Sequence, residues 1–308
     1  MKKSAVAFCI SLACAVCAGE RGPVRGATRV MSYNIRVDTA SDRNTPNRWD
    51  RRRDELVALI RRDNPDVIGF QEVLPGQREF LEKSFPDYSF VGHGRDSNYG
   101  GEACPVAYCK SRFDAVSSGT FWLSDTPEKP GSRDWNSACP RICTYAVLQD
   151  KTIGGRFCIA NTHTDHVSSE AREKGMALVF ERMPVFAKGV PCILTGDHNC
   201  LENSPPAKYA ASRMASAVHA SETPPSGPWR TFNGFSPAKK TLSAEKALKL
   251  PPGKRDADGG GRIDYIYVSR GLRVLSCRTL DDVRKDAPFY PSDHMPVSAD
   301  IVRAAGIK

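Results

Sequence analysis

Two apolar segments flanking one basic segment decide the fold: residues 28–35 read TRVMSYNI, and residues 66–72 read DVIGFQE. Both are rich in β-branched and aromatic residues, which predicts a strand in each. Between them, residues 48–62 carry apolar side chains at helical spacing among arginines, which predicts an amphipathic surface helix. The pair Asn64-Pro65 ends this helix, because a residue before proline avoids the helical basin. Strand, helix and strand in this order indicate an α/β fold.

The rest of the chain continues this alternation. Further strands are predicted at residues 103–109, 119–122, 144–148, 156–162, 191–195, 262–268 and 297–301, and helices at 76–83 and 169–186. Residues 201–258 are rich in Pro, Ser and Lys with weak periodicity, so we expect a helix with long loops inserted before the last strands. The 308 residues suit one large domain, which we expect over residues 28–303.

The first 18 residues are expected to be a cleaved signal peptide. Lys2 and Lys3 supply its positive end, residues 4–16 form a short apolar stretch, and small residues precede a cut after Ala18. This stretch is shorter than the roughly 20 residues that a membrane-spanning helix needs. We therefore expect export to the periplasm or the medium. No run of 18 or more apolar residues follows, and the mean hydropathy of the whole chain is −0.42, so a polytopic membrane protein is excluded.

Charge and cysteine content add weaker constraints. The net charge of +9 suits an anionic partner without identifying one. Three of the 11 cysteines lie in the expected signal peptide, and an even number in the exported remainder permits disulfides whose pairing stays open. Cys158 and Cys192 lie within apolar strand segments, where we expect buried thiols. Because the chain has no C-x-x-C pair, a structural zinc site is not indicated.

Polar residues stand at the ends of the predicted strands. Asn34 and Glu72 each end an apolar strand, and a carboxylate at such a place can bind a hard cation. Taken singly, each is also explained as a turn cap or a surface acid. Side chains alternate along a strand, so Asn161 and His163 share one face of their strand.

The next strand repeats the pattern. Asp197 and Asn199 share a face, and His198 is expected to point away from both and to pack elsewhere. Asp264 and the turn Ser292-Asp293-His294 complete the series. Six such polar positions in one chain are more than helix and turn caps explain.

In this order, the motifs resemble those of the endonuclease/exonuclease/phosphatase superfamily over about residues 28–303. Residues 119–124 and 140–144 further resemble an exported bacterial branch that is similar to nocturnin and to the carbon catabolite repressor deadenylases. The resemblance implies a four-layer α/β sandwich, in which two mixed β-sheets pack face to face with helices outside. It also implies Mg²⁺, or Mn²⁺, at an active site on one edge of the sheets.

The resemblance assigns roles to matching residues. The implied metal site comprises Glu72 as principal ligand, Asn34 and Asp293. The implied catalytic residues, which orient water, bind phosphoryl oxygens or support those that do, are His163, Asp197, Asn199, Asp264 and His294. The implied substrate contacts are Asn161 and Arg141. His198 and Thr164 depart from the aromatic and apolar residues usual at their positions. Glu102, Asp165 and His166 are left open between a role at the rim of the site and a structural role.

These residues lead to an expected function and its alternatives. We expect an exported Mg²⁺-dependent phosphohydrolase, acting on a phosphoester and most readily a phosphodiester, by in-line attack of water. A small or headgroup-sized substrate is favoured, because no RNA-binding module accompanies the arginines on the solvated face of helix 48–62. We expect a monomeric enzyme. The alternatives are a 3′–5′ exoribonuclease or other nuclease, a zinc hydrolase using His163, His166 and Asp197, and an exported binding protein that has lost catalysis.

Overall fold

The computed structural model describes residues 26–236, 241–256, 261–281 and 290–304. The expected signal peptide, residues 1–18, lies outside this part of the chain. Within the described residues, none of the helices combines the length and the apolar composition needed to cross a bilayer.

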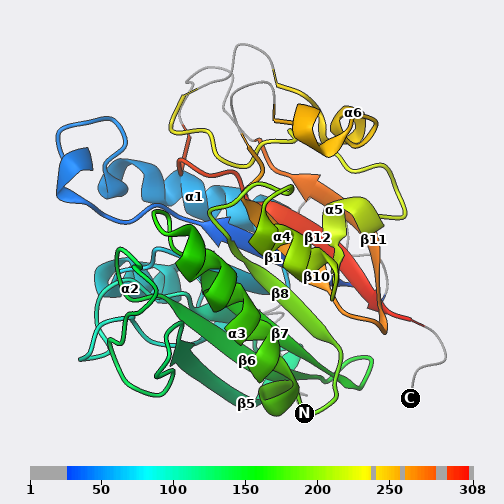
Figure 1. Ribbon diagram of the computed structural model, residues 1–308, viewed down its shortest axis with the longest axis horizontal. Helices are drawn as coiled ribbons and strands as arrows, with labels where there is room; N and C mark the ends of the chain where they lie inside the picture. Colours follow the sequence, from blue (N-terminus) through cyan, green and yellow to red (C-terminus); the bar gives the residue numbers. More distant parts are fainter. Residues whose placement is uncertain (1–25, 237–240, 257–260, 282–289, 305–308) are drawn as a thin grey trace, which may run out of the picture.

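Two six-stranded sheets form the centre of the molecule (Figure 1). In spatial order, the first contains β11 (Leu272–Thr279), β12 (Val297–Arg303), β1 (Thr28–Asn34), β2 (Val67–Gln71), β4 (Val106–Cys109) and β3 (Tyr88–Val91). The second contains β5 (Phe113–Trp122), β6 (Ile142–Asp150), β7 (Arg156–His163), β8 (Cys192–Asp197), β10 (Asp264–Val268) and β9 (Ala215–Ser216). Each sheet is mixed, since β1 pairs with β2 and β7 pairs with β8 in parallel while the other strand pairs are antiparallel.

The two sheets bury one face against each other. Val30 and Val67 of the first sheet share a core cluster with Ile159, Ile193 and Ile266 of the second. The outer face of the first sheet packs against α1 (Trp49–Asp63) and α2 (Pro75–Ser84), and that of the second against α3 (Ser169–Ala187) and α4 (Pro205–Ala211). The expected four-layer α/β sandwich is therefore confirmed.

The insert 201–258 contains more structure than one helix with loops. Besides α4, it forms β9, α5 (Ala217–Ala220), α6 (Ala244–Leu248) and the 3-10 turn η2 (Pro252–Lys254). A second 3-10 turn, η1 (Ala40–Asp42), follows β1. The strand predicted over residues 103–109 begins only at Val106, since Pro105 has no N–H to donate to a ladder. Strands β3 and β11 were not predicted, because partly exposed edge strands lack a continuous apolar run.

The expectation of a solvated arginine face on α1 is wrong at Arg52. Its side chain is fully buried and donates to the carbonyl oxygens of Asn47, Ile35, Pro291 and Arg36. A guanidinium can satisfy its donors with carbonyls inside a protein, so helical spacing alone does not place it outside.

Strand register brings the polar strand ends to one edge. Parallel pairing of β1 with β2 sets Asn34 beside Gln71, and parallel pairing of β7 with β8 sets His163 beside Asp197. Antiparallel pairing of β10 with β8 then places Asp264 opposite Asp197. Both sheets therefore deliver polar side chains to the same region.

Candidate active site

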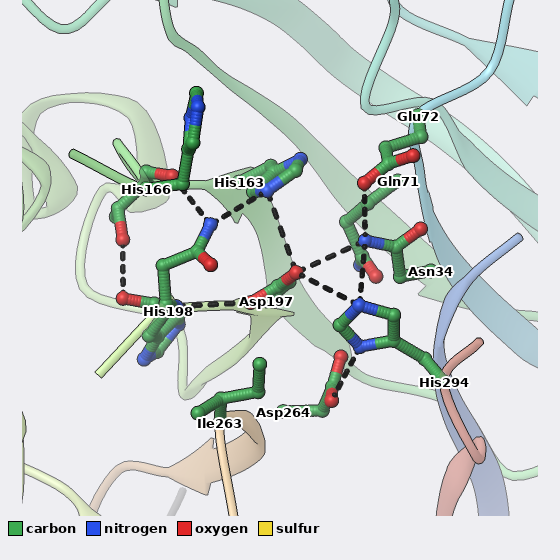
Figure 2. A network of polar contacts seen from close by, with 12 residues as sticks. Asn34, Gln71, Glu72, His163, His166, Asp197, His198, Ile263, Asp264 and His294 are labelled. Atoms are coloured by element: carbon green, nitrogen blue, oxygen red, sulfur yellow. Dashed lines mark hydrogen bonds and ion pairs between the residues drawn. The ribbon is translucent and has the colours of Figure 1, made fainter. Parts of the chain in front are cut away.

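Asn34 joins the polar residues of the two sheets. Its Nδ2 donates to Oε1 of Glu72 at 2.8 Å and to Oδ2 of Asp197 at 2.9 Å. Nε2 of His294 lies 3.4 Å from the same Nδ2 and 3.6 Å from Oδ2 of Asp197. Figure 2 shows these four side chains pointing toward one another.

Glu72 lies in the left-handed backbone region, with φ at 64°. That conformation is uncommon for a residue with a side chain and recurs at functional sites. Its Oε2 accepts a hydrogen bond of 2.7 Å from the backbone N–H of Val37, which fixes the carboxylate beside Asn34. The turn after β2 thus holds Glu72 at the site instead of in the sheet.

The residues present fit a hard divalent cation. Glu72 and Asp293 offer carboxylate oxygens, which are donors that Mg²⁺ and Mn²⁺ accept. Oδ1 of Asn34 accepts from the backbone N–H of Arg36 at 2.9 Å while its Nδ2 faces Glu72, so Asn34 positions the Glu72 carboxylate in this arrangement. Asp293 is almost buried, and burial together with the nearby Glu72 raises the pKa of its carboxyl group. A cation near both acids would offset their repulsion. The alternative zinc set of His163, His166 and Asp197 is not among the metal-capable clusters that the described residues form.

Asp264 holds His294 as a charged ring. Nδ1 of His294 lies 2.9 Å from Oδ2 of Asp264, and both side chains are buried. Burial disfavours the imidazolium, but Asp264 and Asp197 outweigh it, so the pKa of His294 is raised well above its ordinary value. His294 can therefore present an N–H and a positive charge to a phosphoryl oxygen.

Asp197 is suited to take a proton near neutral pH. Burial raises the pKa of Asp197 to about 7, while His294 and two hydrogen bonds favour its charged form. One of these bonds, 2.9 Å long, comes from the backbone N–H of Asn199, which adopts a positive φ of 46°. A carboxyl group with a pKa near the working pH is an effective general base.

His163 is held as a neutral ring. Nδ2 of Asn199 donates to its Nε2 at 2.8 Å, which leaves Nδ1 to carry the proton. Burial and the nearby Arg141 hold the pKa of His163 well below its ordinary value. A neutral His163 can donate from Nδ1 to a phosphoryl oxygen.

Asn161 does not reach substrate, so its expected role is wrong. Its side chain is fully buried, donates to the carbonyls of Phe70 and Pro105, and accepts from Gln71 and Thr195. It shares the inward face of β7 with His163, as predicted. That face meets the other sheet at Asn161, and the amide joins the two sheets.

The remaining candidates divide into rim and framework residues. Arg141 lines a small pocket beside Glu72 and His163. Asp165 is structural, because its carboxylate accepts from the backbone N–H groups of Val167 and Ser168 at the start of α3 and from Ser137. His166 is exposed at the rim, and Glu102 lines the pocket.

The two departures from the superfamily pattern lie outside the site. The ring of His198 packs against Tyr265 and Tyr267 with centroid separations of 5.3 and 5.7 Å, as expected for a residue that points away from Asp197. Oγ1 of Thr164 donates to the carbonyl of His198.

Three site residues were missed from the sequence. Arg36 bridges Asp42 and Asp293, Gln71 links β2 to Asn161, and Arg95 pairs with Glu102. Gln71 adjoins Glu72, so its position was a usable signal. The contacts of Arg36 and Arg95 depend on how loops close, which no periodicity reports.

Comparison with known proteins identifies the family. The model of the Endonuclease/Exonuclease/phosphatase family matches residues 31–294, which span the whole site from Asn34 to His294. The chain belongs to this family. It is therefore a hydrolase of the metal-dependent kind that acts on phosphoester bonds, and its complete site gives no support to a binding protein without catalysis.

Individual relatives agree with this assignment. The structure of a Bacteroides thetaiotaomicron mannosyl-6-phosphatase is 31% identical, covers 89% of this chain and 99% of that chain, and superposes with a TM-score of 0.78. Nocturnin of Drosophila melanogaster is 23% identical over 90% of this phosphohydrolase and 47% of its own length. The Ccr4 exoribonuclease subunit of Emericella nidulans is 24% identical over 59% of this chain and 33% of its own length. The phosphohydrolase spans between 33% and 66% of the curated relatives it matches.

Proposed function

We propose that the protein is an exported Mg²⁺-dependent hydrolase of a small phosphoester, in which water attacks phosphorus in line with the leaving group. The observation that carries this proposal is the convergence of Glu72, Asp197 and His294, whose polar atoms lie within 4.8 Å of one another. Carboxylates, an imidazolium and a cation site together suit attack on a negatively charged phosphorus centre.

The residues of the chain divide the work. Glu72 and Asp293 would hold the cation, with Asn34 fixing the Glu72 carboxylate, and the cation supplies Lewis-acid stabilisation of charge on phosphoryl oxygens. Asp197 orients the attacking water and accepts its proton. His294, kept charged by Asp264, and His163, kept neutral by Asn199, donate to phosphoryl oxygens as charge develops on them.

The small-substrate part of the proposal is supported by the mannosyl-6-phosphatase, whose name places a sugar-sized ester in a site of the same family. A monomeric enzyme remains part of the proposal. The Ccr4 relative supports an exoribonuclease as the second candidate, although its match covers only a third of that protein.

The direct test is turnover by metal-reconstituted protein. We expect hydrolysis of small phosphate esters that depends on Mg²⁺ and is abolished by EDTA. Glu72→Gln should lower turnover by about a thousandfold or more, because the amide keeps the volume and removes the charge that holds the cation. Glu79→Gln, at a carboxylate that is 68% exposed on α2, is the matched control and should retain full turnover. Normal activity of Glu72→Gln at limiting Mg²⁺ would refute the metal assignment.

Export is proposed from the basic and apolar start of the chain and its small residues before Ala18. The intact mass of mature protein from a secreting host should correspond to cleavage after Ala18. A mass that begins at Met1 would rule this out.

A further inference from the structure

A pocket for a single oxygen-sized atom opens beside the proposed cation and phosphoryl site. It is lined by Glu72, Arg95, Glu102, Ala103, Cys104, Arg141, Ile142 and His163. Its volume of about 10 Å³ is close to the space that one water-sized group occupies. A terminal phosphoryl oxygen fits this volume, whereas the carbon substituent of an esterified oxygen would find room only outside it.

Arg141 enters this pocket with unused hydrogen-bonding capacity. The residue is only 5% exposed, and neither Nε nor Nη1 has a hydrogen-bond partner among the described residues. Nη2 donates to Nδ1 of His166, and the carboxylate oxygen paired with Nε, Oδ2 of Asp165, lies 3.7 Å away, beyond hydrogen-bond distance. A buried charge without full hydrogen bonding is unfavourable, so it points to an anionic ligand that supplies the missing acceptors.

The acids around Arg141 are already engaged. Glu102 forms a two-point ion pair with Arg95, with N–O distances of 2.6 and 2.9 Å. Asp165 accepts from Ser137, Val167 and Ser168. Their oxygens therefore do not satisfy Nε and Nη1 of Arg141, and among the described residues these two donors are left for a ligand.

We propose that the enzyme is selective for phosphomonoester dianions, and that Arg141 receives the terminal oxygen that a diester would carry as its second ester link. This inference rests on the proposed phosphoester hydrolysis and replaces the expectation of a diester. A phosphomonoester near neutral pH carries close to two charges on three terminal oxygens, whereas a diester carries one charge on two. The pocket and its arginine recognise that difference.

The test compares two esters with the same leaving group, p-nitrophenyl phosphate and methyl p-nitrophenyl phosphate. For the wild-type enzyme, we expect a kcat/KM ratio that favours the monoester by at least about a hundredfold. Arg141→Met should lower the monoester kcat/KM by tenfold to a hundredfold, about the value of charge-assisted hydrogen bonds, and reduce the preference at least tenfold. Inhibition by inorganic phosphate should weaken in parallel.

Two further variants separate recognition from structure. Arg141→Lys keeps one charge without the planar fork, so it should recover part of the monoester preference. Arg133→Met, at an exposed arginine, should leave both activities unchanged. Equal losses on both esters in Arg141→Met, or a wild-type enzyme that cleaves the diester as well as the monoester, would overturn the inference while leaving phosphoester hydrolysis intact. Inactivity of the metal-loaded wild type on every ester would overturn the proposed function, and this inference with it.

Discussion

His198 is buried, and neither ring nitrogen has a hydrogen-bond partner among the residues that the structure describes, which is an unusual state for a polar side chain. It follows β8 and packs against both Tyr265 and Tyr267, pointing away from Asp197. Burial lowers the pKa of His198 to about 4, whereas an unfolded histidine protonates near its ordinary value. The folded enzyme therefore contains a neutral imidazole at a position where a hydrocarbon ring would serve the packing equally well.

We predict that His198→Phe stabilises the protein and weakens its sensitivity to acid. As pH falls from about 7 to 4, the unfolded state takes up a proton that folded His198 refuses, so the free energy of unfolding drops by up to about 3 kcal/mol. In the variant, the free energy of unfolding should fall less between pH 7 and pH 4. At pH 7.5 it should be about 1–2 kcal/mol higher than in the wild type, because the unsatisfied ring nitrogens are removed. Urea unfolding at several pH values in EDTA measures both effects. Parallel wild-type and variant stability profiles would show that His198 does not titrate as described.

A second residue-scale prediction concerns Asp264 and His294, which we expect to act as one unit. Each of Asp264→Asn and His294→Ala should lower kcat by about a hundredfold, because each removes the charged donor at Nε2 of His294. The double variant should be no more than about threefold worse than either single variant. Combining His294→Ala with Asp114→Asn, at a carboxylate that is 66% exposed, provides the additive control. Multiplied losses in the Asp264 and His294 pair would contradict the coupling.

At the scale of elements, α1 fixes the loops that carry the cation ligands. Arg52 donates to carbonyls just after Asn34 and to the carbonyl of Pro291, two residues before Asp293. The carbonyl of Asn47 and the ring of Trp49 complete its surroundings. Burial lowers the pKa of Arg52 to about 10, which leaves the guanidinium charged at neutral pH. One helix residue therefore sets the distance between loops from opposite ends of the chain.

We predict that Arg52→Met raises the Mg²⁺ concentration for half-maximal turnover by about tenfold, since four carbonyls lose their shared donor. Guanidinium ion at millimolar concentration should restore part of that affinity, while the same concentration of NaCl should not. Arg51→Met, one position earlier on α1 and exposed, is the matched control. If the methionine variant is poorly folded, Arg52→Lys should show the same metal defect in a milder form. An unchanged Mg²⁺ concentration for half-maximal turnover in both Arg52 variants would show that Arg52 is not needed to position the two loops.

At the scale of the whole molecule, the sequence predicts the features that depend on local patterns, such as continuous apolar runs and alternating side chains. The apolar strands β1, β2, β7 and β8 stand out because both of their faces are buried, and the polar residues that end them form the site. The alternation of side chains along a strand predicts that Asn161 and His163 share a face of β7. It does not predict that the other sheet packs against this face at Asn161. The burial of Arg52 against the carbonyl of Pro291 and the ion pair of Arg95 with Glu102 depend on how loops fold onto each other, so the local sequence pattern does not predict them.

The arginines of α1 do not form a track for a polymeric substrate at the site. On α1, Arg52 is buried, Arg53 lies over the ring of Phe80, and Arg62 pairs with Glu55. Elsewhere, Arg112 pairs with Asp66 and Asp150 within the fold. Because α1 packs on the outer face of the first sheet, its exposed arginines cover a helix face and do not extend the strand-end site.

We therefore predict that hydrolysis depends little on chain length and salt. A nuclease that neutralises six to ten phosphates loses roughly a thousandfold or more in affinity between 50 and 200 mM salt, whereas a site for one phosphate should lose less than about tenfold. The measurement is kcat/KM for p-nitrophenyl phosphate, a dinucleotide and poly(A) at both salt concentrations, with Glu72→Gln as the inactive control. The small ester should be cleaved fastest, with a shallow salt dependence. Far faster cleavage of poly(A), falling steeply as salt rises, would favour the exoribonuclease and would require a phosphate track that includes the exposed arginines of α1.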